Sequence, residues 1–278
     1  MYDLQVEKPL TAPVLIVAFD GWVSAGSAGT ASAAHIAGDS AVVTRFDSDR
    51  LFDYRVNRPT LDFVDGMIDE VAWPAVTIRL RRIGERDVLV LTGPEPNWGW
   101  QAFGAAIGDL ATDLGVLQHV SLGGIPWPAP HTRPTIVVTT ASRRDLIGAD
   151  ANFPEGLLRV PGSAASIVEK AVADRGIPTV GFWARVPHYV GGIYFPAVVS
   201  LVERVSRYLG IDIPLGSLVD DAAAQRRHLT DALDDQQPIR EIVEQLEAAY
   251  DASGEVASGE EIAAEIERYL RDRGEGLE

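Results

Sequence analysis

Cysteine is absent from all 278 residues of the sequence. This absence excludes a disulfide framework, a thiolate metal site and a cysteine nucleophile. The five histidines do not stand at the short spacings that metal ligands use, so neither a metal site nor any other cofactor is expected. A chain without disulfides is typical of a reducing compartment, and we expect a cytoplasmic protein.

Long apolar runs are also missing. A membrane-spanning helix needs about 18 to 20 apolar residues, whereas the longest apolar stretch here, around residues 75–91, is interrupted by arginine and glycine. The first residues, MYDLQVEKPLTAP, show no basic stretch followed by an apolar run, so no signal peptide is expected. The sequence therefore predicts a protein with no membrane segment.

The common catalytic and nucleotide-binding motifs are not found. The sequence has no GxxxxGK[ST] phosphate loop, no GxSxG nucleophile elbow and no HExxH pair. The glycine-rich stretch GSAGTASAAHIAG (26–38) lacks the GxGxxG spacing of a dinucleotide site. Whether the protein is an enzyme stays open at this point, and the balance favours a protein without catalytic activity.

Positive charge is scarce, and the deficit is concentrated at one end. The net charge is −16, and residues 211–278 alone hold 18 acidic and 6 basic side chains, a net charge of −12. A chain of this charge is not expected to bind nucleic acid. The acidic segment is either a solvated helical surface or a module that selects its partners by charge.

Apolar segments alternate with helical patterns over the first three quarters of the chain. The continuous apolar run PVLIVAFDGW (13–22) predicts a strand buried on both faces. Further strands are expected at 41–46, 75–81, 87–92, 116–122, 135–140 and 177–183, with helices at 24–38, 98–114, 163–175 and 196–209. This alternation predicts a three-layer α/β/α fold with a mostly parallel or mixed sheet. Residues 47–74 break the pattern, and we expect an excursion from the core there.

The last part of the chain is polar and helical. We expect an α/β core domain over 1–212 and an acidic helical extension over 213–278. Apolar residues recur at helical spacing behind Pro238, namely Ile239, Ile242, Val243, Leu246 and Tyr250. A second apolar stripe follows a capping-box pair, Ser258 and Glu261, and consists of Ile262, Ile266, Tyr269 and Leu270.

Two unusual segments follow predicted strands in the first half of the chain, where ligands of α/β sheets commonly bind. In FDGWVSAG (19–26), Asp20, Gly21 and Trp22 either form a simple turn or contribute to a binding rim. In GPEPNWGW (93–100), Glu95 either caps the following helix or acts as an acid or base. Trp98 either packs in the core or lies on the rim.

Two more segments follow strands in the second half. GGIPWPAPHTRP (123–134) contains four prolines, which predict a stiff loop carrying Trp127, His131 and Arg133. RVPHYVGGIYFP (185–196) presents His188 and Tyr189. A histidine could transfer a proton and an arginine could bind a carboxylate or phosphate. An aromatic rim on stiff loops fits a ligand pocket, a subunit contact or a protein interface equally.

These segments, in this order, resemble the proteasome assembly chaperone 2 family in its actinobacterial form. The matching stretches are FDGWVSAGSAG (19–29), LTGPEPNWGWQAF (91–103), LGGIPWPAPHTRP (122–134), ARVPHYV (184–190) and YFPAVVSLVE (194–203). The resemblance implies a fold similar to purine nucleoside phosphorylase and related hydrolases, a homo-oligomer with a trimer favoured, and a C-terminal helical extension. It implies no catalytic residues.

The function implied by the resemblance is that of an assembly factor that binds proteins, possible partners being proteasome subunits. The printed end of the chain, RDRGEGLE, does not carry the hydrophobic–Tyr–any-residue tail of archaeal relatives, so docking by that route is not expected. The alternative is an enzyme or binding protein for a nucleoside-like or anionic small molecule. That alternative expects Asp20, Glu95, His131 and His188 to converge on a concave pocket, with Arg133 binding the anion.

Overall fold

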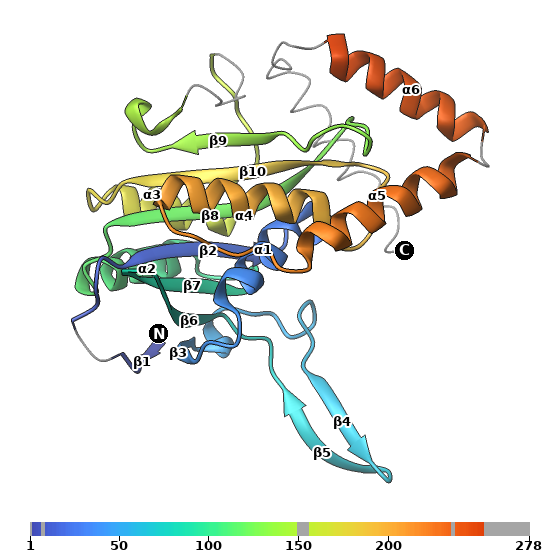
Figure 1. The fold of residues 1–278 in the computed structure, drawn as a ribbon. Coiled ribbons are helices and arrows are strands. Elements are labelled where there is room, and N and C mark those ends of the chain that lie inside the picture. The colour runs from blue at the N-terminus through green and yellow to red at the C-terminus, as the bar shows by residue number, and fades with distance from the viewer. Residues whose placement is uncertain (1, 7–8, 149–155, 235–236, 253–278) are drawn as a thin grey trace. The chain divides into compact units, whose positions relative to one another are not determined.

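The computed structural model describes residues 2–6, 9–148, 156–234 and 237–252 (Figure 1). The contacts within the chain divide it into two compact units. Unit 1 consists of Met1–Trp22, Ala33–Ser121 and Gly162–Thr179. Unit 2 consists of Val23–Ser32, Leu122–Pro161 and Val180–Glu278. Both units are therefore assembled from separate stretches of the chain.

Most of the sheet belongs to unit 1. Its strands are β1 (Tyr2–Leu4), β2 (Val14–Asp20), β3 (Val42–Phe46), β6 (Thr77–Ile83), β7 (Arg86–Pro94) and the first residues of β8 (Gln118–Trp127). They are hydrogen-bonded in the order β1-β3-β6-β7-β2-β8. β2 is parallel to both β7 and β8, while the β1–β3, β3–β6 and β6–β7 pairs are antiparallel. β2 is buried from Val14 to Phe19, as its unbroken apolar run predicts.

Helices α2 (Trp100–Asp113) and α3 (Ala164–Ala173) pack against one another in unit 1. They approach closely because α2 has a glycine at position 104, where an added Cβ would lie 3.1 Å from Ile167. Phe103 joins α2 to the sheet through an edge contact with Phe19, the ring centroids being 5.9 Å apart. The loop around η2 (Ser48–Arg50) also belongs to this unit.

The expected excursion at 47–74 contains a hairpin, β4 (Thr60–Val64) and β5 (Met67–Ala72), which extends away from the rest of unit 1 (Figure 1). Asp65 and Gly66 connect the strands with φ angles of 52° and 81°. Two positive φ angles are what a tight type I′ turn requires, and Asp-Gly is a preferred pair for it. Every residue of both strands is exposed.

Unit 2 contains the rest of β8, all of β10 (Thr179–Pro187) except Thr179, and β9 (Val137–Ala141). The order of these strands in the sheet is β8-β10-β9. β9 and β10 are antiparallel. Helix α4 (Phe195–Leu209) packs on β10, with the Tyr208 and Phe182 rings 5.6 Å apart. The other elements here are η1 (Ala25–Ser27), the first half of α1 (Ala28–Ala37) and η3 (Arg144–Leu146).

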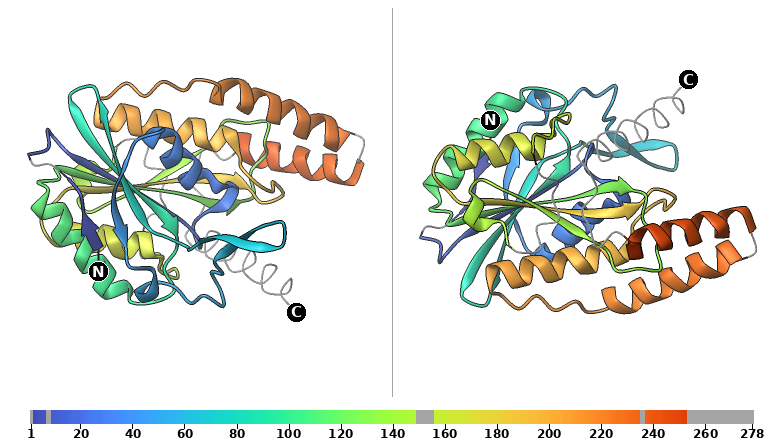
Figure 2. Two further views of the ribbon diagram at one scale, coloured as in Figure 1. Left: turned by 90° about the horizontal axis from the view of Figure 1, so that it is seen from below. Right: turned by 90° about the horizontal axis from the view of Figure 1, so that it is seen from above.

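Two further helices complete unit 2. α5 (Leu218–Asp234) contacts α4, and α6 (Gln237–Ala252) contacts α5. Figures 1 and 2 together show α6 turning back from the end of α5 and diverging from it at an angle. They form the described part of the expected helical extension. The second expected stripe, Ile262 to Leu270, lies outside the described residues, and the domain boundary at 212/213 stays a prediction.

The predicted fold class is confirmed: the protein is α/β, with a mixed sheet and helices on both of its sides. The limits of two strands were wrong. β8 continues to Trp127 and β10 to Pro187, so only 128–134 of the proline-rich segment is a loop. The continuation of β8 includes a bridge between Ser24 and Gly124. Glycine is needed at position 124, because an added Cβ there would overlap the Ala25 carbonyl. Proline is tolerated beyond this point because it lies at the end of the strand. Among the described residues, no helix is both long and apolar enough to cross a membrane.

Candidate functional site

The carboxylate of Glu95 joins two segments of unit 1. It follows β7, and its Oε2 accepts the Trp22 N–H at 2.9 Å while its Oε1 accepts the Ala164 N–H at 2.6 Å. Ala164 is the first residue of α3, where backbone N–H groups have no partner within the helix and attract negative charge. Glu95 therefore caps α3 and fastens the turn that follows β2.

The other residues predicted in unit 1 lie around this contact. Gly21 is needed because a Cβ there would overlap the Glu95 side chain. Asp20 is exposed, Trp22 is half-buried, and the Trp98 side chain is 52 % exposed. The capping predicted for Glu95 at the helix that follows it was wrong: α2 begins after Gly99 without a side-chain cap. The Glu95 carboxylate caps α3 instead, and both of its oxygens accept hydrogen bonds.

Trp127 does not form an exposed rim. Its side chain is 7 % exposed, and the guanidinium of Arg185 lies 4.1 Å from its ring centroid. Arg185 is itself buried, and this burial lowers its pKa to about 10. The Trp127 carbonyl accepts the His188 N–H at 3.2 Å. The His188 side chain is exposed beside this contact.

His131 is buried at 1 % exposure and is part of a continuous hydrogen-bond chain in unit 2. The Tyr189 hydroxyl accepts the His131 backbone N–H at 2.8 Å and also lies 2.9 Å from the imidazole Nδ1. The imidazole Nε2 lies 3.1 Å from Thr230 Oγ1, and the Thr230 hydroxyl donates to the Arg226 carbonyl at 3.0 Å. The chain thus runs from the β10–α4 connection through the proline-rich loop to α5.

This geometry fixes the protons. We assign the proton from these contacts: with the Thr230 hydroxyl donating to the Arg226 carbonyl, its oxygen accepts from His131, and Nε2 carries the imidazole proton. Nδ1 is then the acceptor, and Tyr189 donates to it. His131 is a neutral imidazole with both nitrogens satisfied. Burial lowers its pKa, an effect opposed by Glu247 and reinforced by Arg226, and burial raises the pKa of Tyr189 to about 12.

Arg133 binds carboxylates of α6. Its Nε and Nη2 donate to the two oxygens of Asp251 at 2.8 and 2.6 Å, and its Nη1 donates to Glu247 at 3.3 Å. These bonds raise the pKa of Arg133 and lower that of Asp251. The Thr132 hydroxyl also donates to Glu247, and the Tyr250 hydroxyl donates to the Pro134 carbonyl at 3.1 Å. Loop 128–134 is thus a docking surface for the protein's own helices.

The structure brings the predicted residues together within each unit, as Glu95 with Gly21 and Trp22, and as His131 with Tyr189. Four residues of these contacts were not predicted from the sequence: Thr230, Glu247, Asp251 and the buried Arg185. A signal was present for the carboxylates, because Glu247 and Asp251 are four residues apart and therefore share one face of a helix. Nothing in the local sequence indicates that this face meets Arg133.

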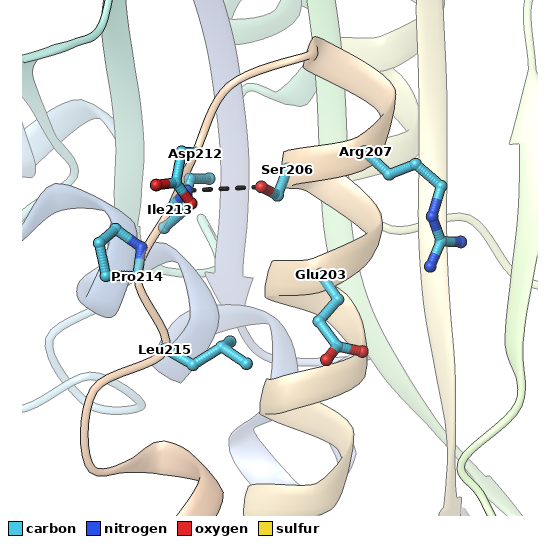
Figure 3. Close-up of a pocket in the computed structure, with 7 residues that line it drawn as sticks. All are labelled: Glu203, Ser206, Arg207, Asp212, Ile213, Pro214 and Leu215. Carbon is cyan, nitrogen blue, oxygen red and sulfur yellow. Dashed lines mark hydrogen bonds between the residues drawn. The ribbon is translucent and has the colours of Figure 1, made fainter.

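Two surface pockets contain none of the predicted site residues. One of about 590 Å³ lies between α4 and the segment that follows it, and Figure 3 shows its lining residues. The Ile213 N–H donates to Ser206 Oγ there at 3.4 Å. The other, of about 660 Å³, lies in unit 1 at the base of the β4–β5 hairpin, near Tyr54 and Trp73. In the described part of the chain, no group of histidine and carboxylate side chains could hold a metal ion.

Known proteins resemble this chain over most of its length. The model of the PAC2 family matches residues 18–233. A protein of unknown function from Mycobacterium tuberculosis is 31 % identical, over 97 % of this chain and 96 % of that one, with a TM-score of 0.86. One of unknown function from Corynebacterium glutamicum is also 31 % identical, over 92 % and 98 %, with a TM-score of 0.85. A proteasome-assembly chaperone homologue from M. tuberculosis is 33 % identical, over 83 % and 99 %, with a TM-score of 0.77. No curated protein matches the chain.

Proposed function

The chain belongs to the PAC2 family, and on this basis we propose that it is a proteasome-assembly-chaperone-like protein that binds other proteins and does not catalyse a reaction. The observation that carries the proposal is the 33 % identity to a protein described as a proteasome-assembly chaperone homologue, over nearly the whole of that protein. Family membership alone does not define a partner, so the contacts of individual residues provide the second line of support.

The chemistry of the predicted residues favours binding over catalysis. A general acid or base needs a reacting group within hydrogen-bond reach. Glu95 instead accepts two backbone N–H groups, and His131 is satisfied on both nitrogens by Tyr189 and Thr230. Arg133, the residue considered for anion binding, is engaged by Asp251. No observation favours the small-molecule alternative over this proposal.

The partners that we propose are proteasome subunits and further copies of this chain, in the cytoplasm, with a homotrimer as the favoured oligomer. Exposed apolar side chains support protein binding. Trp98 is 52 % exposed, and tryptophan is enriched among residues that contribute most to binding energy at interfaces. Phe63 and Ile68 of the hairpin are exposed by 60 and 63 %.

The test is to mix the purified protein with proteasome α and β subunits and to follow complex formation by light scattering. We expect a complex or a change in the rate of assembly. Trp98→Ala should weaken binding at least about tenfold, the effect of losing an interface anchor. Leu117→Ala is the matched control, because Leu117 is also exposed, by 53 %. The absence of any complex and of any rate change would remove the chaperone proposal.

The same preparation tests the small-molecule alternative. A ligand that binds only the folded protein raises its melting temperature. We expect no rise with nucleosides, nucleotides or phosphate. A concentration-dependent rise with one of them would favour the alternative.

A further inference from the structure

The hydrogen-bond chain through His131 connects loop 128–134 to α5, and the ion pairs of Arg133 connect the same loop to α6. We propose that His131 is a proton-operated latch: its neutral imidazole holds α5 and α6 against loop 128–134, and protonation of the imidazole releases the two helices. The proposal concerns a conformational equilibrium of this chain and does not depend on which partners it binds.

The contacts of His131 suit only the neutral ring. A second proton would sit on Nδ1, 2.9 Å from a Tyr189 hydroxyl that already accepts the His131 backbone N–H. The tyrosine hydrogen, now donated to Nδ1, would have to turn to another acceptor. The charge would also be buried, since His131 is 1 % exposed, and burial disfavours the charged form of an imidazole.

Charged groups around the ring act in both directions. Glu247 on α6 favours the protonated ring, while Arg226 on α5 disfavours it, and Tyr189 is uncharged at neutral pH because its pKa is raised. Arg133 and Asp251, on the loop and on α6, neutralise one another. Burial outweighs the attraction of Glu247, so the pKa of His131 is lowered in the docked state.

The sign of the pH effect follows from this lowered pKa. In the released state His131 lies on an open loop and takes the ordinary value of about 6.5. The contribution of His131 to docking is therefore fully present above that pH, and it weakens as the pH falls from 6.5 towards the lowered pKa of the docked state. The ratio of docked to released protein falls by at most about tenfold per pH unit within this window. The Asp251 carboxylate stays ionised through this window, because its hydrogen bonds with Arg133 lower its pKa.

Few apolar contacts oppose release. Over residues 240–252 of α6 only Val243 is buried. Over residues 218–232 of α5, the buried side chains are Leu218 and Ala222, which lie at its first turns, away from Thr230. Thr230 on α5 and residues 244–252 of α6 are at most half-buried. The polar contacts of loop 128–134 therefore contribute to holding both helices, and a change at His131 can shift the equilibrium.

The experiment measures the distance between α6 and the rest of unit 2. Since the chain has no cysteine, Arg207→Cys on α4 and Gln245→Cys on α6, both exposed, place fluorescent labels at two sites only. Energy transfer is recorded from pH 7.5 to 5.0 at constant ionic strength. We expect transfer to fall below pH 6.5, and this fall to be absent in His131→Gln. His228→Gln is the matched control, an exposed histidine of α5 whose loss should leave the response unchanged.

A second variant covers the case in which His131→Gln does not fold. Thr230→Val removes the acceptor of the Nε2 proton from a half-buried position of α5 and should increase the released fraction already at pH 7.5. The proposal is overturned if the parent shows no response to pH, if His131→Gln responds as the parent does, or if Thr230→Val matches the parent at pH 7.5.

Discussion

Polar side chains in this protein are used mainly to fasten its own segments. Glu95, His131 and Arg133 each have the chemistry of a functional residue, and each is occupied by a partner within its own unit. A buried or half-buried polar group must find such a partner, because leaving it unsatisfied costs about 1 to 3 kcal/mol. Residue type alone therefore did not distinguish a capping or latching role from a catalytic one.

His119 departs from this behaviour and leads to a prediction about acid stability. It is fully buried on β8, neither ring nitrogen has a hydrogen-bond partner among the described residues, and burial lowers its pKa to about 3. An unfolded chain binds the proton at about pH 6.5. Proton binding by His119 therefore has no effect on stability above about pH 6.5, and it reduces the free energy of unfolding by up to about 1.4 kcal/mol per pH unit as the pH falls below that value.

Urea unfolding between pH 7.5 and 4.5 checks this prediction. In His119→Leu, whose side chain is of similar size and does not titrate, the free energy of unfolding should fall less steeply below pH 6.5 than in the parent. His228→Gln, at an exposed histidine, should keep the parent slope. Equal slopes in the parent and in His119→Leu would show that the buried imidazole does not control acid stability.

Among the elements, the β4–β5 hairpin has the least support from the rest of unit 1. A two-stranded hairpin is at best marginally stable alone in water. A register shift between Leu61 and Phe63 pairs these residues with Val71 and Ile68, so that all four share one face. They are exposed by 36 to 63 %. An apolar face of this kind typically marks an interaction surface, and it supports the proposed homo-oligomer.

The corresponding prediction concerns the mass of the protein in solution. Phe63→Ser with Ile68→Ser removes apolar area from this face and should shift the oligomer towards monomer, as measured by light scattering coupled to gel filtration. Asp62→Ser is the control, because Asp62 alternates with Phe63 and points to the opposite face. An unchanged mass in the double variant would exclude the hairpin as the oligomer contact.

The elements also show what can be predicted from the sequence. The strand–helix alternation followed from local patterns, such as the unbroken apolar run of β2, and the structure confirms it. The hairpin could have been found from the Asp65–Gly66 pair between alternating apolar residues. The contact between the proline-rich loop and α6 could not be predicted in this way, because the partners of Arg133 are 114 to 118 residues away along the chain. Hydrophobic periodicity carries no information about pairing at that separation.

The whole molecule is divided into units that are interleaved along the chain. Each unit is made of three stretches, and their boundaries cut through α1 at 32/33 and through β8 at 121/122. Because α1 contributes residues to both units, one unit cannot unfold completely without breaking this helix. This interleaving predicts a single cooperative unfolding transition, although chains of this length often unfold through intermediates.

Glu95→Ala provides the test, because Glu95 lies in unit 1 and fastens two segments of that unit only. Losing its charged hydrogen bonds should cost about 1.5 to 3 kcal/mol. Unfolding in urea is followed by far-ultraviolet circular dichroism and by tryptophan fluorescence, which also reports on Trp127 and Trp183 of unit 2. If the molecule unfolds cooperatively, Glu95→Ala should lower the midpoints from both probes by the same amount. Glu85→Ala is the control, since the Glu85 side chain is 99 % exposed and its ion pair with Arg82 is long, at 3.7 Å. Two separated transitions, with only one moved by Glu95→Ala, would mean that the units unfold independently despite the shared helix.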